Sequence, residues 1–217
     1  MLLALAVTTT RELPSAQDAL LLPGVTAYML AARQFAEWIM KRLALAALAA
    51  TVLAFRADAA LKPGDAAPDF VAQASLGGKE FTFSLAEALK KGPVVLYFYP
   101  AAFTTGCTIE AHEFAEAIDK YAALGASVIG VSSDDIATLN KFSVSECRSK
   151  FPVAADADKK IMTAYDAKLA FGYANRTSYV IVPDGRIIYE YTALDPSGHV
   201  ENTLAAIEKW KAAPPAR

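Results

Sequence analysis

The sequence predicts an α/β domain with a mixed central β-sheet and helices on both faces. Two apolar runs, 92–100 and 126–133, are typical of buried strands, and each precedes a segment with helical spacing. Two β-rich runs then surround Pro183-Asp184-Gly185, which indicates a hairpin, and residues 197–210 form a closing amphipathic helix. Strands that alternate with helices and end in an antiparallel hairpin imply this layered arrangement.

The first elements follow from turn and cap residues. Residues 61–70 are expected to be extended because two prolines and Gly64 exclude a helix. Residues 73–89 contain a Gly-Gly turn between two short strands, and Ser84 is then placed to cap a short helix. The run 92–100 is expected to be covered on both faces, as a central strand is, and Pro100 ends it.

The next helix is predicted over residues 107–125. Its apolar face is expected to consist of Ile109, Phe114, Ile118 and Tyr121, and Gly125 supplies the C-terminal stop. After the strand 126–133, a further helix should start near residues 133–134 and fade towards residue 148. A short helical piece at 159–167 and a loop at 167–175 lead into the hairpin at 177–194.

Composition restricts the classes of function. The chain has 217 residues and a net charge of −2, and its 21 Lys and Arg are scattered, so no basic surface for nucleic acid is expected. The two histidines, His112 and His199, and two cysteines distant from them cannot assemble a four-ligand metal site. We therefore expect no metal and no other cofactor. Two cysteines allow at most one disulfide.

Residues 40–59 have the pattern of a secretory signal peptide. Met40 precedes two basic residues, an apolar run at 43–55 and the A-x-A cleavage motif Ala57-Asp58-Ala59. The apolar run is shorter than the roughly 20 residues that span a bilayer, so we expect no stable membrane insertion after the signal is removed. The alternative interpretation is a buried Ala- and Leu-rich helix.

A signal peptide acts at the start of a chain, so residues 1–39 are out of place. We expect translation to begin at Met40, which would make residues 1–39 a wrongly assigned upstream extension. Alternatively, 1–39 is a genuine extension that buries the signal and keeps the protein inside the cell. Under the first interpretation the mature domain is 60–217, in the periplasm or secreted, where conditions are oxidising.

Cys107 follows the central strand at the predicted start of a helix. The unpaired N–H groups at a helix N-terminus lower the pKa of a thiol, and ligand sites form at the C-terminal ends of such strands. The alternative is a small buried apolar residue, since free cysteine is often buried. Thr104 lies one turn before Cys107, where its hydroxyl can hold a small oxygen substrate, and Pro100 can shield the sulfur without an N–H.

The residues from Pro100 to Cys107 fit P-x-x-x-T-x-x-C, and this motif resembles the active site of the peroxiredoxins, the AhpC/TSA type. The flanking stretches "KPGDAAPDF" and "VVLYFYP" are similar to the bacterioferritin-comigratory-protein, or Q-type, branch. The resemblance spans about residues 61–212. It implies a thioredoxin-like fold and the reduction of hydrogen peroxide and organic hydroperoxides, with Cys107 as the nucleophile that becomes a sulfenic acid.

The resemblance also implies an arginine at the start of a late strand, and Arg176 in "NRTSYVIVPDG" has that setting. Its charge would stabilise the thiolate and the developing negative charge on the leaving oxygen. A surface ion pair is the alternative role for Arg176. Glu110 matches a family position that orients this arginine, although a carboxylate there would also complement the helix dipole.

The sequence departs from the family at His112, where many Q-type members carry a resolving cysteine. The remaining candidate is Cys147, and since some family members resolve from that helix, the resemblance suggests a Cys107–Cys147 disulfide after local unwinding. The alternative is a one-cysteine enzyme with Cys147 as a packed thiol. We expect a thioredoxin-like or other thiol reductant and a monomer or weak homodimer.

Three other functions have their own sequence requirements. A copper-delivering member of the same fold would require a second cysteine four residues before Cys107, where Phe103 stands. A thioredoxin-like disulfide oxidoreductase would require Cys-x-x-Cys, which Cys107 lacks. A non-catalytic peroxide sensor that relays oxidation through Cys147 is the alternative to the peroxidase.

Overall fold

The computed structural model describes Phe35, Trp38 and residues 60–213. Residues 60–213 belong to one compact unit, whose bounds are 58–217. Apart from Phe35 and Trp38, the upstream segment 1–39 and the expected signal peptide 40–59 lie outside the described residues. Within the described residues, no helix has both the length and the apolar character needed to cross a membrane.

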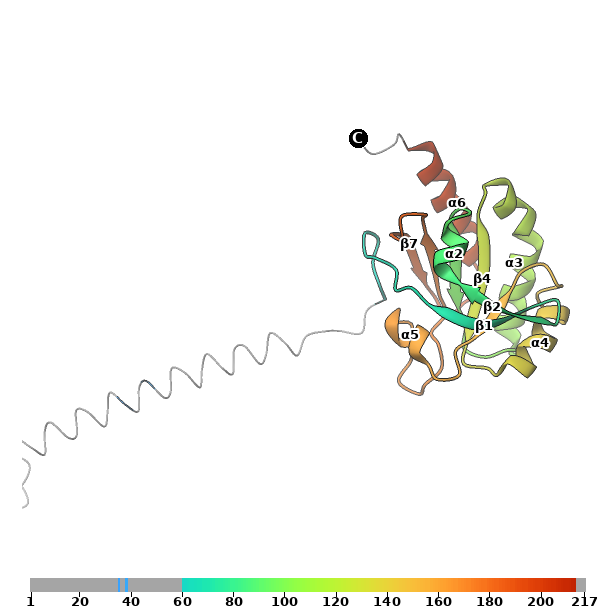
Figure 1. Cartoon of the computed structure of the whole chain (residues 1–217), viewed down its shortest axis with the longest axis horizontal. Coiled ribbons are helices and arrows are strands. Elements are labelled where there is room, and N and C mark those ends of the chain that lie inside the picture. Colours follow the sequence, from blue (N-terminus) through green and yellow to red (C-terminus); the bar gives the residue numbers. More distant parts are fainter. Residues whose placement is uncertain (1–34, 36–37, 39–59, 214–217) are drawn as a thin grey trace, which may run out of the picture. The chain divides into compact units, whose positions relative to one another are not determined.

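Strands and helices alternate along the domain, as Figure 1 shows. In chain order they are β1 (Val71–Leu76), β2 (Lys79–Ser84), α2 (Leu85–Leu89), β3 (Val94–Phe98), α3 (Thr105–Ala123), β4 (Ser127–Ser132), α4 (Ile136–Ser145), β5 (Val153–Ala155), α5 (Lys160–Ala164), β6 (Thr177–Ile181), β7 (Ile187–Thr192) and α6 (His199–Ala212). Ser84 caps α2 through its hydroxyl, as predicted, by accepting a hydrogen bond from the Glu87 N–H.

The strands form a mixed sheet in the order β2-β1-β5-β4-β3-β6-β7. Strand β4 runs parallel to β3 and β5, whereas β6 pairs with β3 in the antiparallel direction. In that pairing Phe98, at the end of β3, lies opposite Thr177, at the start of β6. The register therefore brings the residue before β6 to the edge of the sheet where α3 begins.

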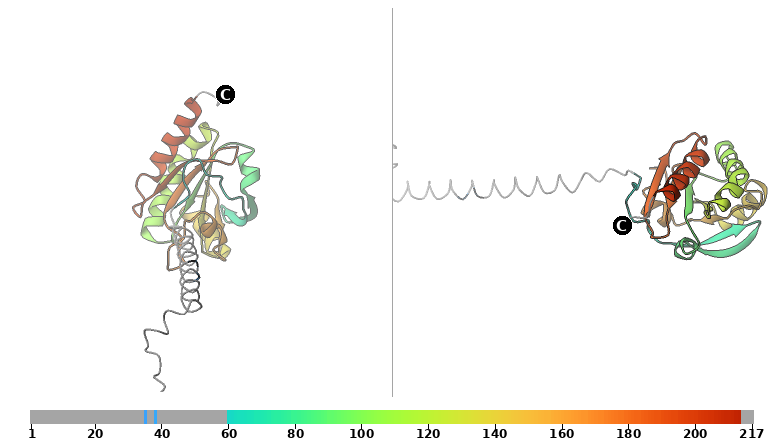
Figure 2. Two further views of the ribbon diagram at one scale, coloured as in Figure 1. Left: turned by 90° about the vertical axis from the view of Figure 1, so that its left-hand side faces the viewer. Right: turned by 90° about the horizontal axis from the view of Figure 1, so that it is seen from above.

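Helices cover both faces of this sheet, which confirms the predicted fold class. Along β3 the side chains alternate between two cores: Val94, Leu96 and Phe98 face one, and Val95 and Tyr97 face the other. Helices α2 and α5 pack on the first core, and α3, α4 and α6 pack on the second. Figure 2 shows α3 and α6 on the same side of the sheet.

Two expectations for the elements were wrong in detail, and one short strand was not predicted. Ile109 is 44% exposed, so it does not belong to the buried face of α3, on which Phe114 and Tyr121 lie. Helix α4 begins at Ile136, later than the expected start near residues 133–134. The Asp135 side chain caps it by accepting a hydrogen bond from the Thr138 N–H. Strand β5 was not predicted, because three residues are too short to show an alternation of burial.

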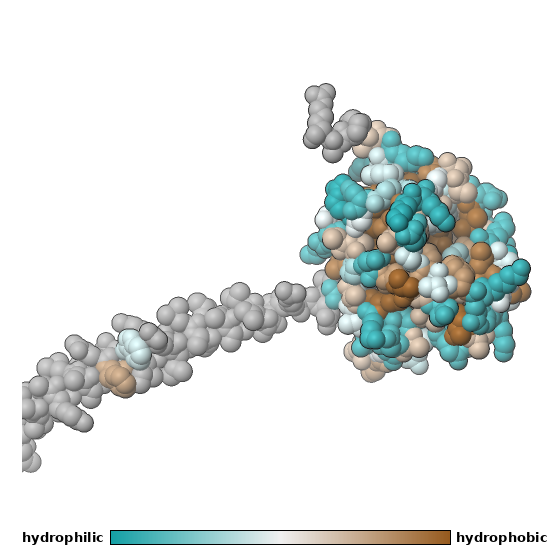
Figure 3. All heavy atoms as spheres, viewed as in Figure 1, coloured by the Kyte–Doolittle hydropathy of each residue, from teal (hydrophilic) through white to brown (hydrophobic). Residues whose placement is uncertain are grey.

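Apolar side chains also reach the surface of the domain, where brown residues are interspersed with teal ones (Figure 3). Such scattered exposure is ordinary, because polar groups cannot cover a whole protein surface. We assign no binding surface from it.

Candidate active site

The loop between β3 and α3 holds the predicted nucleophile. Pro100 is half-buried just after β3, and Thr104 is the N-cap of α3, with an extended backbone (φ −76°, ψ 148°). Cys107 therefore lies in the first turn of α3, and its side chain is only 1% exposed. A thiol in the first turn lies close to the unpaired N–H groups and the positive end of the helix dipole.

Thr104 is exposed, and its hydroxyl donates a hydrogen bond to the Ala101 carbonyl at 3.0 Å. In this structure that hydroxyl therefore stabilises the loop. The role suggested by the sequence, holding a peroxide oxygen beside Cys107, stays a prediction.

The same loop contains a strained residue. Phe103 has φ +63°, in the left-handed region that residues other than glycine rarely adopt. Its ring packs edge-on against Phe142 of α4, at a centroid distance of 5.3 Å. One residue earlier, the Ala102 N–H donates to a carboxylate oxygen of Asp134 at 2.7 Å, which ties the loop to the end of β4. Such strain persists only where neighbouring contacts fix the backbone.

Arg176 directly precedes β6 and extends its guanidinium to Cys107, with Nη2 at 3.5 Å from Sγ. The side chain is fixed at two further atoms: Nε donates to the Leu194 carbonyl at 2.9 Å, and Nη1 donates to Glu110 Oε2. Arg176 is 5% exposed, so its charge acts with little screening by water. A Cβ at Gly106 would lie 2.9 Å from Nη2, which shows how closely the guanidinium approaches α3.

Glu110 lies one turn after Cys107 on α3 and is fully buried. Burial raises the pKa of Glu110 to about 8, and the neighbouring Arg176 charge opposes that rise. The pKa of Arg176 is raised: its own burial acts to lower it, but the charges of Glu110 and Cys107 outweigh that effect. The structure thus brings Cys107, Arg176 and Glu110 into one buried cluster.

His199, for which no sequence pattern predicts a role, also belongs to this cluster. Its Nδ1 lies 3.6 Å from Glu110 Oε1, and its side chain is fully buried at the start of α6. The spacing of the α6 residues could have shown that His199 is buried. His199, Thr203 and Ile207 follow one another at four-residue intervals and form the buried face of the helix. The sequence alone did not indicate that this face meets Glu110.

Cys147 is a free, fully buried thiol just after α4, and burial raises its pKa. It packs in the same apolar cluster as Cys107, but the two are not bonded. His112, at the position of the absent resolving cysteine, lies beside Glu146, with Nε2 3.0 Å from Oε2. Next to Cys147 on the other side, Arg148 pairs with Glu116 of α3 at 3.1 Å.

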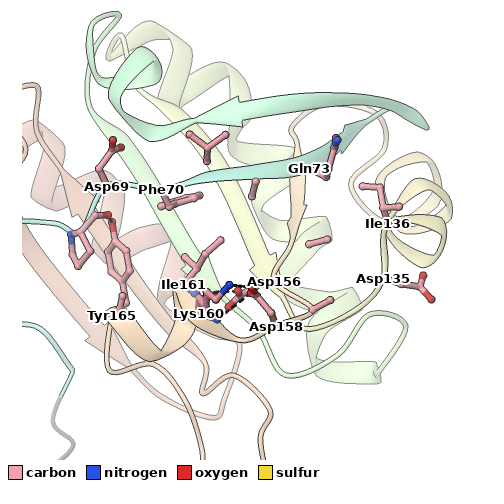
Figure 4. Close-up of a pocket in the computed structure, with 16 residues that line it drawn as sticks. Asp69, Phe70, Gln73, Asp135, Ile136, Asp156, Asp158, Lys160, Ile161 and Tyr165 are labelled. Atoms are coloured by element: carbon pink, nitrogen blue, oxygen red, sulfur yellow. Dashed lines mark hydrogen bonds and ion pairs between the residues drawn. The ribbon is translucent and has the colours of Figure 1, made fainter.

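A hollow of about 780 Å³ lies away from the thiol, between β1, α5 and the start of α4 (Figure 4). None of the predicted site residues lines it. Asp156, one of its polar groups, already accepts hydrogen bonds from the N–H groups of Ile161 and Met162 at 3.0 and 2.8 Å. Since this carboxylate is engaged in capping α5, the hollow receives no role in the chemistry of the site.

Comparison with known proteins gives a consistent result. The family model described as the AhpC/TSA family matches residues 63–190. A Mycobacterium tuberculosis protein with a peroxiredoxin name is 33% identical over 147 residues, 64% of this chain and 90% of that protein. Peroxiredoxin Q, chloroplastic, from Triticum aestivum is 37% identical over 130 residues, 58% of this chain and 59% of that protein.

A solved structure agrees with these sequence matches. The crystal structure of peroxidoxin BcpB from Mycobacterium tuberculosis covers 69% of this chain and 97% of its own, with a TM-score of 0.63 and 30% identity. The thioredoxin-like fold suggested by the resemblance is thereby confirmed. The chain belongs to the AhpC/TSA family, with relatives in the Bcp and Q-type peroxiredoxin branch, and is a thiol-dependent peroxidase.

Proposed function

We propose that this enzyme reduces hydrogen peroxide and organic hydroperoxides with Cys107 as the nucleophile. The observation that carries the proposal is the contact of Arg176 Nη2 with Cys107 Sγ at 3.5 Å, in the first turn of α3. The helix terminus and the guanidinium both place positive charge beside the sulfur that is to attack the peroxide.

In the proposed reaction the Cys107 thiolate attacks one peroxide oxygen in line with the O–O bond. An S–O bond forms as the O–O bond breaks, so sulfur is oxidised to a sulfenic acid and the peroxide is reduced. The leaving oxygen takes a proton from water and departs as water or an alcohol. Arg176 stabilises its developing charge, Thr104 holds the peroxide and Pro100 shields the thiolate.

We further propose that Cys147 resolves the sulfenic acid. Its sulfur would attack Cys107 Sγ, an S–S bond would form, and the sulfenic oxygen would leave as water. A thioredoxin-like dithiol would then reduce the disulfide. Both thiols are buried, so the step requires local rearrangement. Arg148 and Ser149, which follow Cys147, both have a left-handed backbone, with φ of +52° and +55°, and a rearrangement of this segment would release that strain.

Stopped-flow mixing of the reduced protein with one equivalent of hydrogen peroxide tests both proposals. Cys107→Ser should abolish peroxide consumption, and unchanged turnover would refute the assignment of Cys107. After oxidation, mass spectrometry of the wild type should show a Cys107–Cys147 disulfide, with a loss of two hydrogens. A stable sulfenic acid in the wild type would refute the role of Cys147 and leave that of Cys107 intact.

We also propose that residues 40–59 direct export and that the mature protein, 60–217, acts in the periplasm or outside the cell as a monomer or weak homodimer. The sequence pattern of 40–59 supports export. Expression of the full chain and of a chain starting at Met40, followed by N-terminal sequencing of the exported fraction, tests the proposal. A mature N-terminus near Ala60 is expected. Retention of both proteins in the cytoplasm would contradict it.

A further inference from the structure

A second layer of polar side chains lies behind Arg176, away from Cys107. Glu110, His199 and Ser178 are all fully buried. Ser178 Oγ lies 2.8 Å from His199 Nδ1, and Glu110 Oε1 lies 3.6 Å from the same nitrogen. The series of contacts from sulfur to imidazole thus runs from Cys107 through Arg176 and Glu110 to His199.

The neighbours of His199 fix its tautomer. Nε2 lies 3.1 Å from the Ala193 carbonyl, which can only accept, so Nε2 carries a hydrogen. In the neutral imidazole Nδ1 then has a lone pair, and the Ser178 hydroxyl can donate to it. That lone pair also faces Glu110 Oε1.

Glu110 Oε1 is left without a hydrogen-bond partner, although Oε2 accepts from Arg176. If both groups were deprotonated, two buried acceptors, Oε1 and Nδ1, would face each other across 3.6 Å. An unpaired buried carboxylate oxygen is costly. One proton between the two atoms turns this repulsion into an attraction.

The charges lead to the same conclusion. A Cys107 thiolate, an ionised Glu110 and the Arg176 cation sum to one buried negative charge. One proton on the Glu110–His199 pair makes the cluster neutral, and the Arg176 charge then serves the thiolate alone. Buried uncompensated charge is strongly unfavourable, so the proton favours the thiolate.

We propose that Glu110 and His199 share one proton, and that His199 is a positioning residue whose Nδ1 accepts this proton from Glu110 Oε1 in a hydrogen bond, which retains the proton on Glu110 and thereby keeps Cys107 a thiolate. The proposal rests on the assignment of Cys107 as the nucleophile. His199 touches neither peroxide nor sulfur and acts through Glu110 and Arg176.

Burial supports this distribution of protons. It raises the pKa of Glu110 to about 8 and lowers the pKa of His199 to about 4, so the proton belongs to Glu110 in the neutral range. Titratable and charged groups face the pair from each packed element. Glu113 of α3 acts on Glu110, Asp195 before α6 acts on His199, and Arg176 before β6 acts on both. Glu110 in turn acts on Tyr97 of β3, the ring of Tyr191 of β7 contacts that of His199 edge-on, and Cys107 of α3 reaches the pair through Arg176.

The test is the pH dependence of Cys107 alkylation in the reduced full chain, with the labelled cysteine identified by mass spectrometry. His199→Gln keeps a donor for the Ala193 carbonyl but has no acceptor in the place of Nδ1. We expect the apparent pKa of Cys107 to rise by about one unit, so the alkylation rate on the acidic limb of the profile, below both pKa values, falls about tenfold. The rate at the alkaline plateau should stay within about twofold of the wild type.

Three further variants make the test specific. His112→Gln changes the other, partly exposed histidine and should not shift the Cys107 titration. Ser178→Ala removes the hydroxyl that competes for Nδ1, so it should leave the apparent pKa unchanged or lower it. Glu110→Gln cannot ionise, so His199→Gln should add a shift of under about 0.3 units in that background.

A fall in rate by the same factor at every pH would show that His199 only supports packing and would overturn the proposal. An undiminished shift in the Glu110→Gln background would also overturn it, because His199 would then act without Glu110. If His199→Gln does not fold, Ser178→Ala still tests the proposal. A rise in the apparent pKa of Cys107 in the Ser178→Ala variant would contradict it. Alkylation involves no peroxide, so failure of the proposed peroxide chemistry is seen separately, in the stopped-flow experiment.

Discussion

At the residue scale, the reactivity of Cys107 depends on how the Arg176 guanidinium is held. One edge faces the sulfur, and the other contacts are with Glu110 and the Leu194 carbonyl. A planar guanidinium can make these contacts together because its donors point in fixed, diverging directions. A lysine ammonium carries the same charge from a single nitrogen and cannot reproduce them.

Arg176→Lys should therefore slow the oxidation of Cys107 by about 100-fold, the equivalent of losing one or two charge-assisted hydrogen bonds. The measurement is the second-order rate constant for hydrogen peroxide by stopped-flow fluorescence. Arg186→Lys is the matched control, since Arg186 is exposed and pairs with Asp184 in the β6–β7 turn. A fall of less than about threefold for Arg176→Lys would show that a positive charge is enough for the fast oxidation of Cys107, without the diverging donors of the guanidinium.

The sequence was informative about some members of the cluster and not about others. Cys107 and Arg176 could be named because a motif and a strand start point to them. The Glu110–His199 contact joins residues far apart in the chain, and no local pattern records which helix faces meet. His199 gave only a weak signal, since a histidine on an apolar helix face is usually a satisfied core residue.

At the element scale, the packing of the Tyr97 ring of β3 against β4 depends on a missing side chain. A Cβ at Gly130 of β4 would lie 2.7–2.8 Å from ring atoms of Tyr97 on β3. The Tyr97 ring cannot withdraw, because it is stacked on Phe114 at 4.4 Å and is fully buried. The glycine thus makes room for an aromatic ring of the core.

Gly130→Ala should lower the free energy of unfolding by about 1–3 kcal/mol, as overpacking in cores does. Urea denaturation monitored by circular dichroism measures this change. The double variant with Tyr97→Leu should show that the two substitutions are coupled, because the smaller side chain leaves space for the new methyl group. Additive losses would contradict the steric explanation.

Most elements could be predicted from the sequence because β3 and β4 are continuous apolar runs and turn residues bound the hairpin. The exceptions have local causes. Strand β5 has three residues and exists because β4 and β1 pair with it on either side. Ile109 has an apolar side chain at a helical position, but its direction depends on where α3 meets the sheet, which spacing alone does not give.

Two polar side-chain contacts join α3 to the segment that carries Cys147, and both would oppose its movement. They link His112 to Glu146 and Glu116 to Arg148. Such partly exposed pairs contribute about 0–1 kcal/mol each. Replacing His112 and Arg148 by alanine removes up to about 2 kcal/mol and should therefore speed disulfide formation after peroxide treatment by up to about 30-fold, measured by quenched-flow mass spectrometry.

The matched control for that experiment is Lys90→Ala, which removes an exposed ion pair within the α2 region. Its disulfide formation should keep the wild-type rate. A slower reaction in the His112 and Arg148 variant would show that these pairs guide the two cysteines together instead of restraining them.

At the scale of the whole molecule, Glu110 and His199 make stability depend on pH with opposite signs. The pKa of Glu110 rises from 4.5 to about 8 on folding, so stability is lost as the pH rises through that range. The pKa of His199 falls from 6.5 to about 4, so stability is lost as the pH falls through its range. Between pH 4.5 and 6.5 the pair binds one proton in both the folded and the unfolded state, and the two slopes cancel.

Above pH 6.5 the cancellation ends, because the unfolded pair has lost its proton and the folded pair keeps it until about pH 8. The free energy of unfolding should therefore fall by about 2 kcal/mol between pH 6.5 and pH 8. Urea denaturation at several pH values measures this slope. A Cys107→Ser background removes the titration of that thiol, and the slope should disappear when Glu110→Gln is added. An equal slope with and without Glu110→Gln would mean that Glu110 is already ionised at pH 6.5. The buried cluster would then tolerate the negative charge that the shared proton is proposed to remove.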